Sequence, residues 1–274
     1  TYPAILDDDT VGDTASALMD DAEQMLDRII GEGWLSARGV FGTFPANSDG
    51  AETINIYTDE SRTEIASRFN TIRQQIRKTG GKGGDRPNFA LADFVAPVET
   101  GIADYIGGFA VTAGIGIDEH VARFEEANDD YNAILLKALA DRLAEAFAER
   151  LHERVRKEFW GYAATESLDN HALINESYQG IRPAPGYPAC PDHTEKDGLF
   201  RLLGATEAAG IELTESFAML PTAAVSGFYI SHPESRFFGT GKIAKDQVED
   251  YARRKDMDVA TAERWLAPIL GYER

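Results

Sequence analysis

Cysteine and long apolar runs are nearly absent from this sequence. Its 274 residues contain one cysteine, Cys190, which cannot form an internal disulfide and leaves no cysteine-rich metal site. No stretch approaches the roughly 18 to 20 apolar residues that a membrane span needs. The start of the chain, with Asp7, Asp8 and Asp9, lacks the composition of a signal peptide. We therefore expect a cytoplasmic protein without a membrane segment.

Basic residues are also scarce. Lys and Arg number 27 against 46 Asp and Glu, which gives a formal net charge of −19. Because nucleic-acid binding depends on neutralising phosphates, this balance argues against a nucleic-acid partner. It suits a cationic ligand or partner, although solubility alone would explain it. The sequence has no initiator methionine, so we expect a fragment of a longer protein or a processed chain.

Helical and strand patterns are partly segregated along the chain. Helical spacing of apolar residues predicts helices over about 14–31, 62–78, 118–127, 129–160, 194–203, 245–255 and 259–266. Alternating apolar residues predict strands over about 40–44, 53–57, 89–95, 103–112, 212–219, 224–231 and 237–243. Such a mixture is typical of the α+β class with an antiparallel sheet.

The longest periodic stretch covers residues 129–160. One apolar stripe on it consists of Ile134, Leu136, Leu139, Leu143, Phe147, Leu151 and Val155. The stripe lasts too few heptads for a coiled coil, so the sequence predicts one long helix that forms the spine of the domain.

Four of the 11 prolines lie between Pro183 and Pro191, within the sequence Q-G-I-R-P-A-P-G-Y-P-A-C-P-D-H-T-E-K of residues 179–196. Proline fixes its own φ, disfavours the helical region for the residue before it and cannot donate to a strand ladder. The sequence therefore predicts a stiff extended loop, the proline loop, with one flexible joint at Gly186. Such a loop presents its backbone to a ligand at little entropic cost. A rigid surface connector is the alternative.

Other chemistry has little support in the sequence. Cys190 and His193 are three residues apart, but no third residue is evident that would orient them as a nucleophile and base. His193 and His232 lack the spacing of a zinc-binding helix. Paired carboxylates for glycoside hydrolysis have no positive evidence either.

The segment R-P-A-P-G-Y-P-A-C-P-D-H-T-E-K closely resembles the S-adenosylmethionine-binding loop in the activation domain of cobalamin-dependent methionine synthases. Further segments resemble the same family in order along the chain: L-A-D-F-V-A-P (91–97), A-D-Y-I-G-G-F-A-V-T (103–112), K-A-L-A-D-R-L-A-E-A-F-A-E-R-L-H-E (137–153), L-T-E-S-F-A-M (213–219), V-S-G-F-Y-I-S-H-P (225–233) and D-Q-V-E-D-Y-A-R-R-K (246–255). The resemblance implies one elongated, C-shaped activation domain over residues 1–274, with a central antiparallel sheet, at the C-terminal end of a modular enzyme.

S-adenosylmethionine presents a carboxylate, a cationic ammonium and sulfonium, and an adenosine. Arg182 carries a planar fork that suits the carboxylate. The backbone of Ala184, Gly186 and Tyr187 can meet the adenine edge because glycine permits close approach. The resemblance implies this role for the loop, with the ring of Tyr187 packed against the nucleoside.

Carboxylates are expected near the cationic centre. Asp141, Glu145 and Glu149 recur every four residues and share one helix face, which on sequence grounds is most often solvated. The resemblance implies that Glu145 and Glu176 border the bound S-adenosylmethionine.

The resemblance places an aromatic pair, Phe237 and Phe238, at the same site. Members of the family commonly have tyrosine at the first position, so Phe237 keeps the aromatic face and lacks the hydroxyl. An aromatic ring near a sulfonium contributes about 0.5–2 kcal/mol of cation–π attraction. The family also has an aspartate, upstream of the counterpart of Tyr2-Pro3, that contacts the amino group; we expect its absence to weaken binding.

The function that the resemblance implies is reactivation of methionine synthase. Such a domain swings over a cobalamin-binding domain, receives an electron from flavodoxin or an equivalent reductase, and supports remethylation of cob(II)alamin by S-adenosylmethionine. This chain alone would have no complete activity. The alternative is an interaction or sensor domain that keeps the fold without methyl transfer.

A cluster of positive charge lies on or just after the helix predicted over 62–78. It consists of Arg62, Arg68, Arg73, Arg77, Lys78 and Lys82. Arg73 and Arg77 would share a helix face and would steer an acidic, flavodoxin-like donor. Pairing of these arginines with Glu60 and Glu64 is the alternative.

Overall fold

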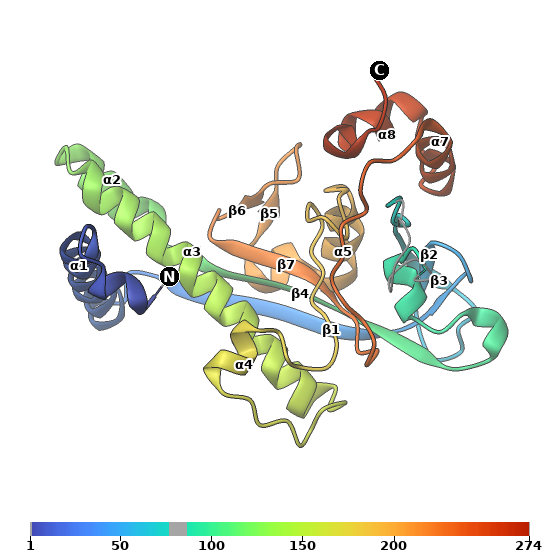
Figure 1. Ribbon diagram of the computed structural model, residues 1–274, viewed down its shortest axis with the longest axis horizontal. Helices are drawn as coiled ribbons and strands as arrows, with labels where there is room; N and C mark the ends of the chain where they lie inside the picture. Colours follow the sequence, from blue (N-terminus) through green and yellow to red (C-terminus); the bar gives the residue numbers. More distant parts are fainter. Residues whose placement is uncertain (1, 77–86, 274) are drawn as a thin grey trace.

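A five-stranded antiparallel sheet forms the centre of the structure, a computed structural model that describes residues 2–76 and 87–273 (Figure 1). The strand order is β3-β2-β1-β4-β7, and every neighbouring pair is antiparallel. The sheet strands are β1 (Ser36–Ser48), β2 (Thr53–Tyr57), β3 (Ile65–Asn70), β4 (Asp104–Ile115) and β7 (Ala224–Tyr229). A separate hairpin consists of β5 (Glu212–Leu213) and β6 (Met219–Leu220).

Helices cover both faces of the sheet and extend beyond its ends. The α-helices are α1 (Gly12–Glu32), α2 (Ile117–Glu126), α3 (Asp130–Arg154), α4 (Asn170–Ile174), α5 (Glu195–Leu203), α6 (Ala205–Ala209), α7 (Lys245–Arg254) and α8 (Val259–Trp265). Short 3-10 helices are Ala4–Asp7, Leu91–Phe94, Val98–Thr100 and Ala267–Ile269, and a π-helical turn, Val155–Phe159, continues α3. Figure 1 shows α1 and α2 at one end of an elongated molecule and α7 and α8 at the other. None of the helices in the described part of the chain has the length and apolar character that crossing a membrane requires.

Alternation along β4 sends side chains into two separate cores. Phe109 and Val111 pack with the α3 side chains Ala148 and Leu151, whereas Ala110 packs with residues of α5 and α6. Because successive strand residues point to opposite faces, α3 covers one face of the sheet and α5 and α6 cover the other. The expected α+β class with a central antiparallel sheet is confirmed.

The long helix predicted over 129–160 is confirmed, but its buried stripe differs in part. Ile134 is 66% exposed, and the helix instead buries a row of small residues that includes Ala140, Ala144 and Ala148. Small side chains allow a helix backbone to approach the sheet closely, and this brings the neighbouring polar residues of α3 near β4 and β7.

The helix predicted over 62–78 is wrong. Residues 65–70 form β3, which pairs with β2 so that Phe69 lies opposite Ile54, and both side chains are buried. Residues 71–76 belong to no helix or strand, and residues 77 and 78 lie outside the described residues. Tertiary pairing at the sheet edge therefore overrides the local helical pattern.

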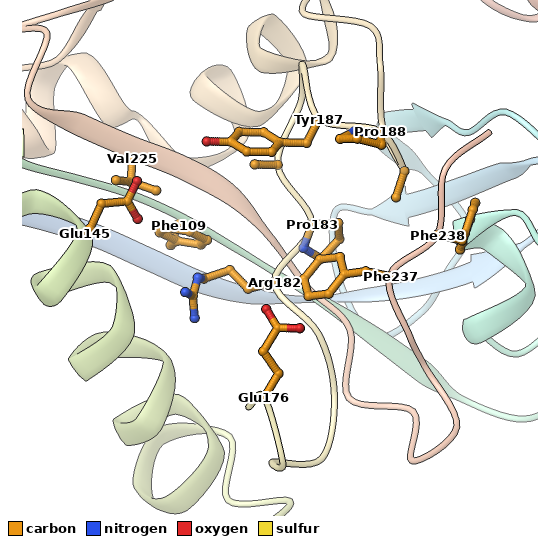
Figure 2. Close-up of a pocket in the computed structure, with 12 residues that line it drawn as sticks. Phe109, Glu145, Glu176, Arg182, Pro183, Tyr187, Pro188, Val225, Phe237 and Phe238 are labelled. Atoms are coloured by element: carbon orange, nitrogen blue, oxygen red, sulfur yellow. The ribbon is translucent and has the colours of Figure 1, made fainter. Parts of the chain in front are cut away.

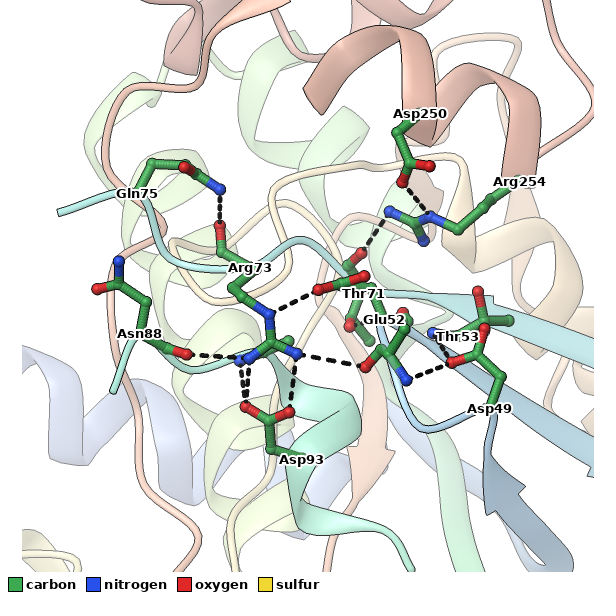
Figure 3. A network of polar contacts seen from close by, with 12 residues as sticks. Asp49, Glu52, Thr53, Thr71, Arg73, Gln75, Asn88, Asp93, Asp250 and Arg254 are labelled. Carbon is green, nitrogen blue, oxygen red and sulfur yellow. Dashed lines mark hydrogen bonds and ion pairs between the residues drawn. The ribbon is translucent and has the colours of Figure 1, made fainter. Parts of the chain in front are cut away.

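The basic cluster predicted on that helix does not form the expected face. Arg73 donates to Glu52 at 2.6 Å and to both carboxylate oxygens of Asp93 at 2.7 and 2.9 Å (Figure 3). Arg62 lies 3.7 Å from Glu60. Arg77, Lys78 and Lys82 lie outside the described residues. The charge of Arg73 is thus balanced within the domain, and its predicted role in partner docking loses its basis.

Three of the predicted strands are also wrong. Residues 89–95 contain a 3-10 helix whose Asp93 carboxylate accepts from the Ala90 N–H at 2.9 Å. Residues 212–219 are divided between β5 and β6, with a turn in which Phe217 has a φ of 60°. Residues 237–243 form no strand; the Thr240 N–H donates instead to the Pro188 carbonyl of the proline loop at 3.1 Å.

Candidate functional site

A cavity of about 550 Å³ lies between the proline loop, α3 and the strands β4 and β7 (Figure 2). Its lining residues are Phe109, Glu145, Glu176, Arg182, Pro183, Ala184, Tyr187, Pro188, Ala189, Val225, Phe237 and Phe238. Seven of the eight site residues predicted from the sequence are among them, and Gly186 is not. A cavity of this size with a mainly apolar wall and a few charged groups is typical of a small-molecule site.

The start of the proline loop is fastened along β7. Ile181 and Ile230 exchange two backbone hydrogen bonds of 2.9 and 3.1 Å, and the Phe228 N–H donates to the Pro183 carbonyl at 2.9 Å. Gly227 permits this approach, because a Cβ there would lie 2.6 Å from the Pro183 carbonyl oxygen. The loop thus begins as an added edge of the sheet, and this fixes where Arg182 leaves the backbone.

The tip of the loop is a tight turn held by its own backbone. Gly186 N–H donates to the Cys190 carbonyl at 2.7 Å, and Cys190 N–H donates to the Tyr187 carbonyl at 2.9 Å. Gly186 has a φ of 99°, which favours glycine, and a Cβ there would lie 2.1 Å from the His193 ring. Gly186 therefore shapes the turn and contacts His193.

Two residues of α3 hold the side chain of Arg182 in place. Its Nη2 donates to Glu149 Oε2 at 3.0 Å, and its Nη1 donates to His152 Nδ1 at 3.0 Å. Its side chain is only 18% exposed. These two bonds leave further guanidinium N–H groups for a ligand in the cavity, since the group has five donors.

Two carboxylates enter the same space as the guanidinium. Figure 2 shows Glu145 coming from α3 and Glu176 from the segment before the proline loop. Glu176 has a φ of 52°, a conformation that costs a non-glycine residue about 1–3 kcal/mol. Two lining carboxylates against one lining arginine leave the cavity with a net negative charge, which suits a cationic ligand.

Aromatic side chains form the rest of the wall. Tyr187 is 62% exposed and Phe237 is 43% exposed, so both rings have free faces at the mouth of the cavity. Phe109, from β4, stacks on Tyr229 with ring centroids 4.7 Å apart. Phe238 packs against the main core cluster, and it lines the cavity while it anchors its own segment.

Sequence analysis did not predict Glu149, His152, Phe109 or Val225 at this site. Glu149 shares a helix face with Asp141 and Glu145, and this spacing was the sequence feature that could have indicated its place at the site. His152 lies three residues further along α3 and is buried. Their role depends on contact with Arg182, about thirty residues away in the sequence, and spacing within one helix does not reveal that contact.

The proline loop does not bring a nucleophile and base together. Burial raises the pKa of the Cys190 thiol well above its usual value, and His193 Nδ1 instead lies 2.9 Å from Lys196 Nζ. Within residues 2–76 and 87–273, no group of three or more His, Cys, Asp or Glu side chains has the arrangement of a metal site.

Buried His152 predicts a pH dependence of stability. Burial lowers its pKa to about 2, with help from the charges of Arg156 and Arg182, whereas an unfolded histidine titrates near 6.5. Below that pH the unfolded chain binds the additional proton, so stability falls as the pH falls. Glu149 is the carboxylate bonded to the same Arg182.

Between pH 7 and pH 5 we expect this histidine to cost about 2 kcal/mol of unfolding free energy. His152→Asn removes the titrating ring, so the unfolding free energy of this variant should fall by about 2 kcal/mol less than that of the parent between pH 7 and pH 5. Urea unfolding of both proteins at the two pH values measures the difference. Equal losses in the two proteins would show that His152 accepts a proton in the folded state.

Comparison with known proteins agrees with this geometry. Residues 1–256 match the family described as "Vitamin B12 dependent methionine synthase, activation domain". A solved structure, "Crystal Structure of the MetH Reactivation Domain bound to AdoHcy", is 57% identical in sequence with a TM-score of 0.94, and the match covers 100% of this chain and 82% of that chain.

The fold and the cavity define a domain of the methionine synthase reactivation type. This chain belongs to the family of vitamin B12-dependent methionine synthase activation domains. The resemblance carried by the proline loop is thereby confirmed. As an activation domain it is one part of a cobalamin-dependent methyltransferase.

Proposed function

We propose that the cavity beneath the proline loop binds S-adenosylmethionine. The observation that carries this proposal is the meeting of one fixed guanidinium and two carboxylates in a single cavity with an otherwise apolar and aromatic wall. S-adenosylmethionine needs this combination, because it has a carboxylate, two cationic groups and a flat adenine. The similar reactivation domain was solved with AdoHcy, the demethylated form of the same compound.

Each part of the ligand has a matching group. The free N–H groups of Arg182 bind the carboxylate, and Glu145 and Glu176 balance the ammonium and sulfonium. The backbone of Ala184 and the ring of Tyr187 hold the adenosine, and Phe237 covers the sulfonium side with an aromatic face. Gly186 contributes by shaping the turn that presents Tyr187.

The chemistry of cobalamin, one-electron reduction of cob(II)alamin followed by methylation, belongs to a neighbouring domain of the same enzyme. This chain's own residues bind the methyl donor and orient it. Flavodoxin or an equivalent reductase supplies the electron, and the enzyme works in the cytosol. We propose that residues 1–274 are one module of a longer chain; Ile72, which follows β3, shares a core cluster with side chains of α7 and α8, and this contact supports a single domain.

Arg182→Ala should weaken binding of AdoHcy at least tenfold, since a charge-assisted bond contributes about 1.5–3 kcal/mol. The structure adds a second effect, because the substitution also leaves Glu149 and His152 without their partner. Thermal stability should therefore fall as well. Arg182→Lys should rescue affinity only in part, because a point charge lacks the guanidinium fork.

Isothermal calorimetry with the parent chain and both variants measures these effects. Arg201→Ala is the matched control: Arg201 forms an exposed ion pair with Asp197, and it does not line the cavity. If Arg182→Ala bound AdoHcy as tightly as the parent and Arg201→Ala, Arg182 would not belong to the site.

A further inference from the structure

The buried face of α3 beneath the cavity carries a histidine to which the proposed function assigns no role. His152 lies at 0% exposure. Its ring stacks on Tyr229 with centroids 5.0 Å apart and meets the edge of Tyr178 at 5.0 Å. Phe109 also stacks on Tyr229, with ring centroids 4.7 Å apart, and lines the cavity. His152 therefore sits in a rigid aromatic stack directly behind the ligand wall.

The contact with Arg182 determines the protonation state of this ring. Arginine has only donors, so His152 Nδ1, 3.0 Å from Arg182 Nη1, must be the acceptor. The ring is then neutral and carries its proton on Nε2, and Nε2 has no partner among the described residues. Arg156, four residues further along in the π-helical turn that continues α3, adds positive charge nearby and also disfavours protonation.

We propose that His152 is a positioning residue that, together with Glu149, sets the direction in which Arg182 presents its remaining N–H groups to the carboxylate of the ligand. This inference rests on the proposed function and extends it to a residue outside the cavity wall.

The neutrality of His152 matters to the balance of charge. Glu149 already supplies one carboxylate to Arg182. A second anion would neutralise the guanidinium further and compete with the ligand carboxylate, whereas a neutral imidazole nitrogen fixes the geometry without adding negative charge. The stacked rings allow His152 little freedom, so Arg182 should be ordered before the ligand arrives.

The test uses two ligands that differ in the amino-acid part. AdoHcy has the carboxylate, and 5′-methylthioadenosine has the same nucleoside and a thioether without it. His152→Leu removes the acceptor and should weaken AdoHcy binding about tenfold, the size of one lost hydrogen bond to a charged group. It should leave methylthioadenosine binding within about twofold, since that ligand does not use Arg182. His152→Asn places an amide oxygen near the position of Nδ1 and should recover most of the AdoHcy affinity.

Two controls separate positioning from general damage. His120→Leu removes another stacked histidine, which packs on Trp34 outside the cavity, and should change neither affinity. In an Arg182→Met background, His152→Leu should cause no further loss, because the two residues act through one contact. The proposal would be overturned if His152→Leu weakened the binding of both ligands equally, or of neither. It would also be overturned if His152→Asn failed to restore AdoHcy affinity. The same holds if His152→Leu caused its full loss of AdoHcy affinity, about tenfold, in the Arg182→Met background.

A ligand-free measurement keeps this inference separate from the proposed function. The ¹⁵N chemical shifts of His152 should report the neutral Nε2–H tautomer in the parent chain and a changed tautomer balance in Arg182→Met. A parent that binds neither ligand contradicts the proposed function, and the shifts still decide the role of His152. A protonated ring, or the same shifts with and without Arg182, would contradict positioning.

Discussion

Replacing Lys255 by methionine is expected to lower the free energy of unfolding by about 3–5 kcal/mol. Lys255 Nζ lies 3.0 Å from Asp192 and 2.5 Å from Glu195, and both carboxylates are almost completely buried. The hydroxyl of Tyr251 lies 2.7 and 3.2 Å from the same two carboxylates. Without the ammonium group, the two buried carboxylates would depend on neutral donors, such as the Tyr251 hydroxyl and the N–H and hydroxyl of Thr194.

This cluster joins the end of the proline loop and the start of α5 to α7. Lys255→Met should therefore also loosen the loop. Urea unfolding measures the effect, with Lys137→Met as the matched control, because the ion pair of Lys137 with Glu125 is half exposed and should contribute about 1 kcal/mol or less. If Lys255→Met and Lys137→Met lowered the free energy of unfolding by similar amounts, the buried cluster would not stabilise the fold more than an exposed ion pair does.

The second large effect is expected at Gly227, where the proline loop meets β7. A Cβ at this position would lie 2.6 Å from the Pro183 carbonyl oxygen, which is a backbone atom of the loop. Gly227→Ala must push the loop away from the sheet and stretch the Phe228–Pro183 hydrogen bond. Overpacking of this kind costs about 1–3 kcal/mol. Because Arg182 precedes Pro183, we expect AdoHcy binding to weaken at least tenfold as well.

Gly31→Ala is the matched control for Gly227→Ala. Gly31 lies in α1, and a Cβ there meets nothing within 4 Å, so this variant should be more stable than the parent by about 0.5–1 kcal/mol. Calorimetric titration and thermal unfolding compare the two. If Gly227→Ala bound AdoHcy like the parent, the loop would not need its close contact with β7.

The sequence predicts those parts of the fold that local chemistry determines. Prolines made the loop over 179–196 predictable, and helical spacing made α3 predictable over nearly its full length. The segment 62–78 failed because its local spacing is helical, while burial of Phe69 opposite Ile54 depends on a partner strand. The strand predicted over 237–243 failed because its backbone bonds go to separate segments: Thr240 bonds to Pro188 of the proline loop and to Gln75, and Ile243 bonds to residues 269 and 271.

In the candidate site, too, residues within one distinctive segment were predictable and residues that depend on distant contacts were not. Arg182 and Tyr187 were predictable because they lie within one distinctive loop, and Glu145 followed from the family resemblance. Glu149 and His152 were not, because each gains its role from Arg182, which a different segment supplies. Gly186 was predicted at the ligand because glycine permits close approach, whereas in the structure its positive φ shapes the turn.

The most direct test of the account is a titration of the unmodified chain with S-adenosylmethionine, followed by displacement with AdoHcy. We predict saturable binding at one site per chain, competitive with AdoHcy and reduced at least tenfold in Arg182→Ala. An added upstream segment with the expected aspartate should tighten it. If neither the chain nor its extended form bound S-adenosylmethionine, the cavity would not be a methyl-donor site and the proposed function would be wrong.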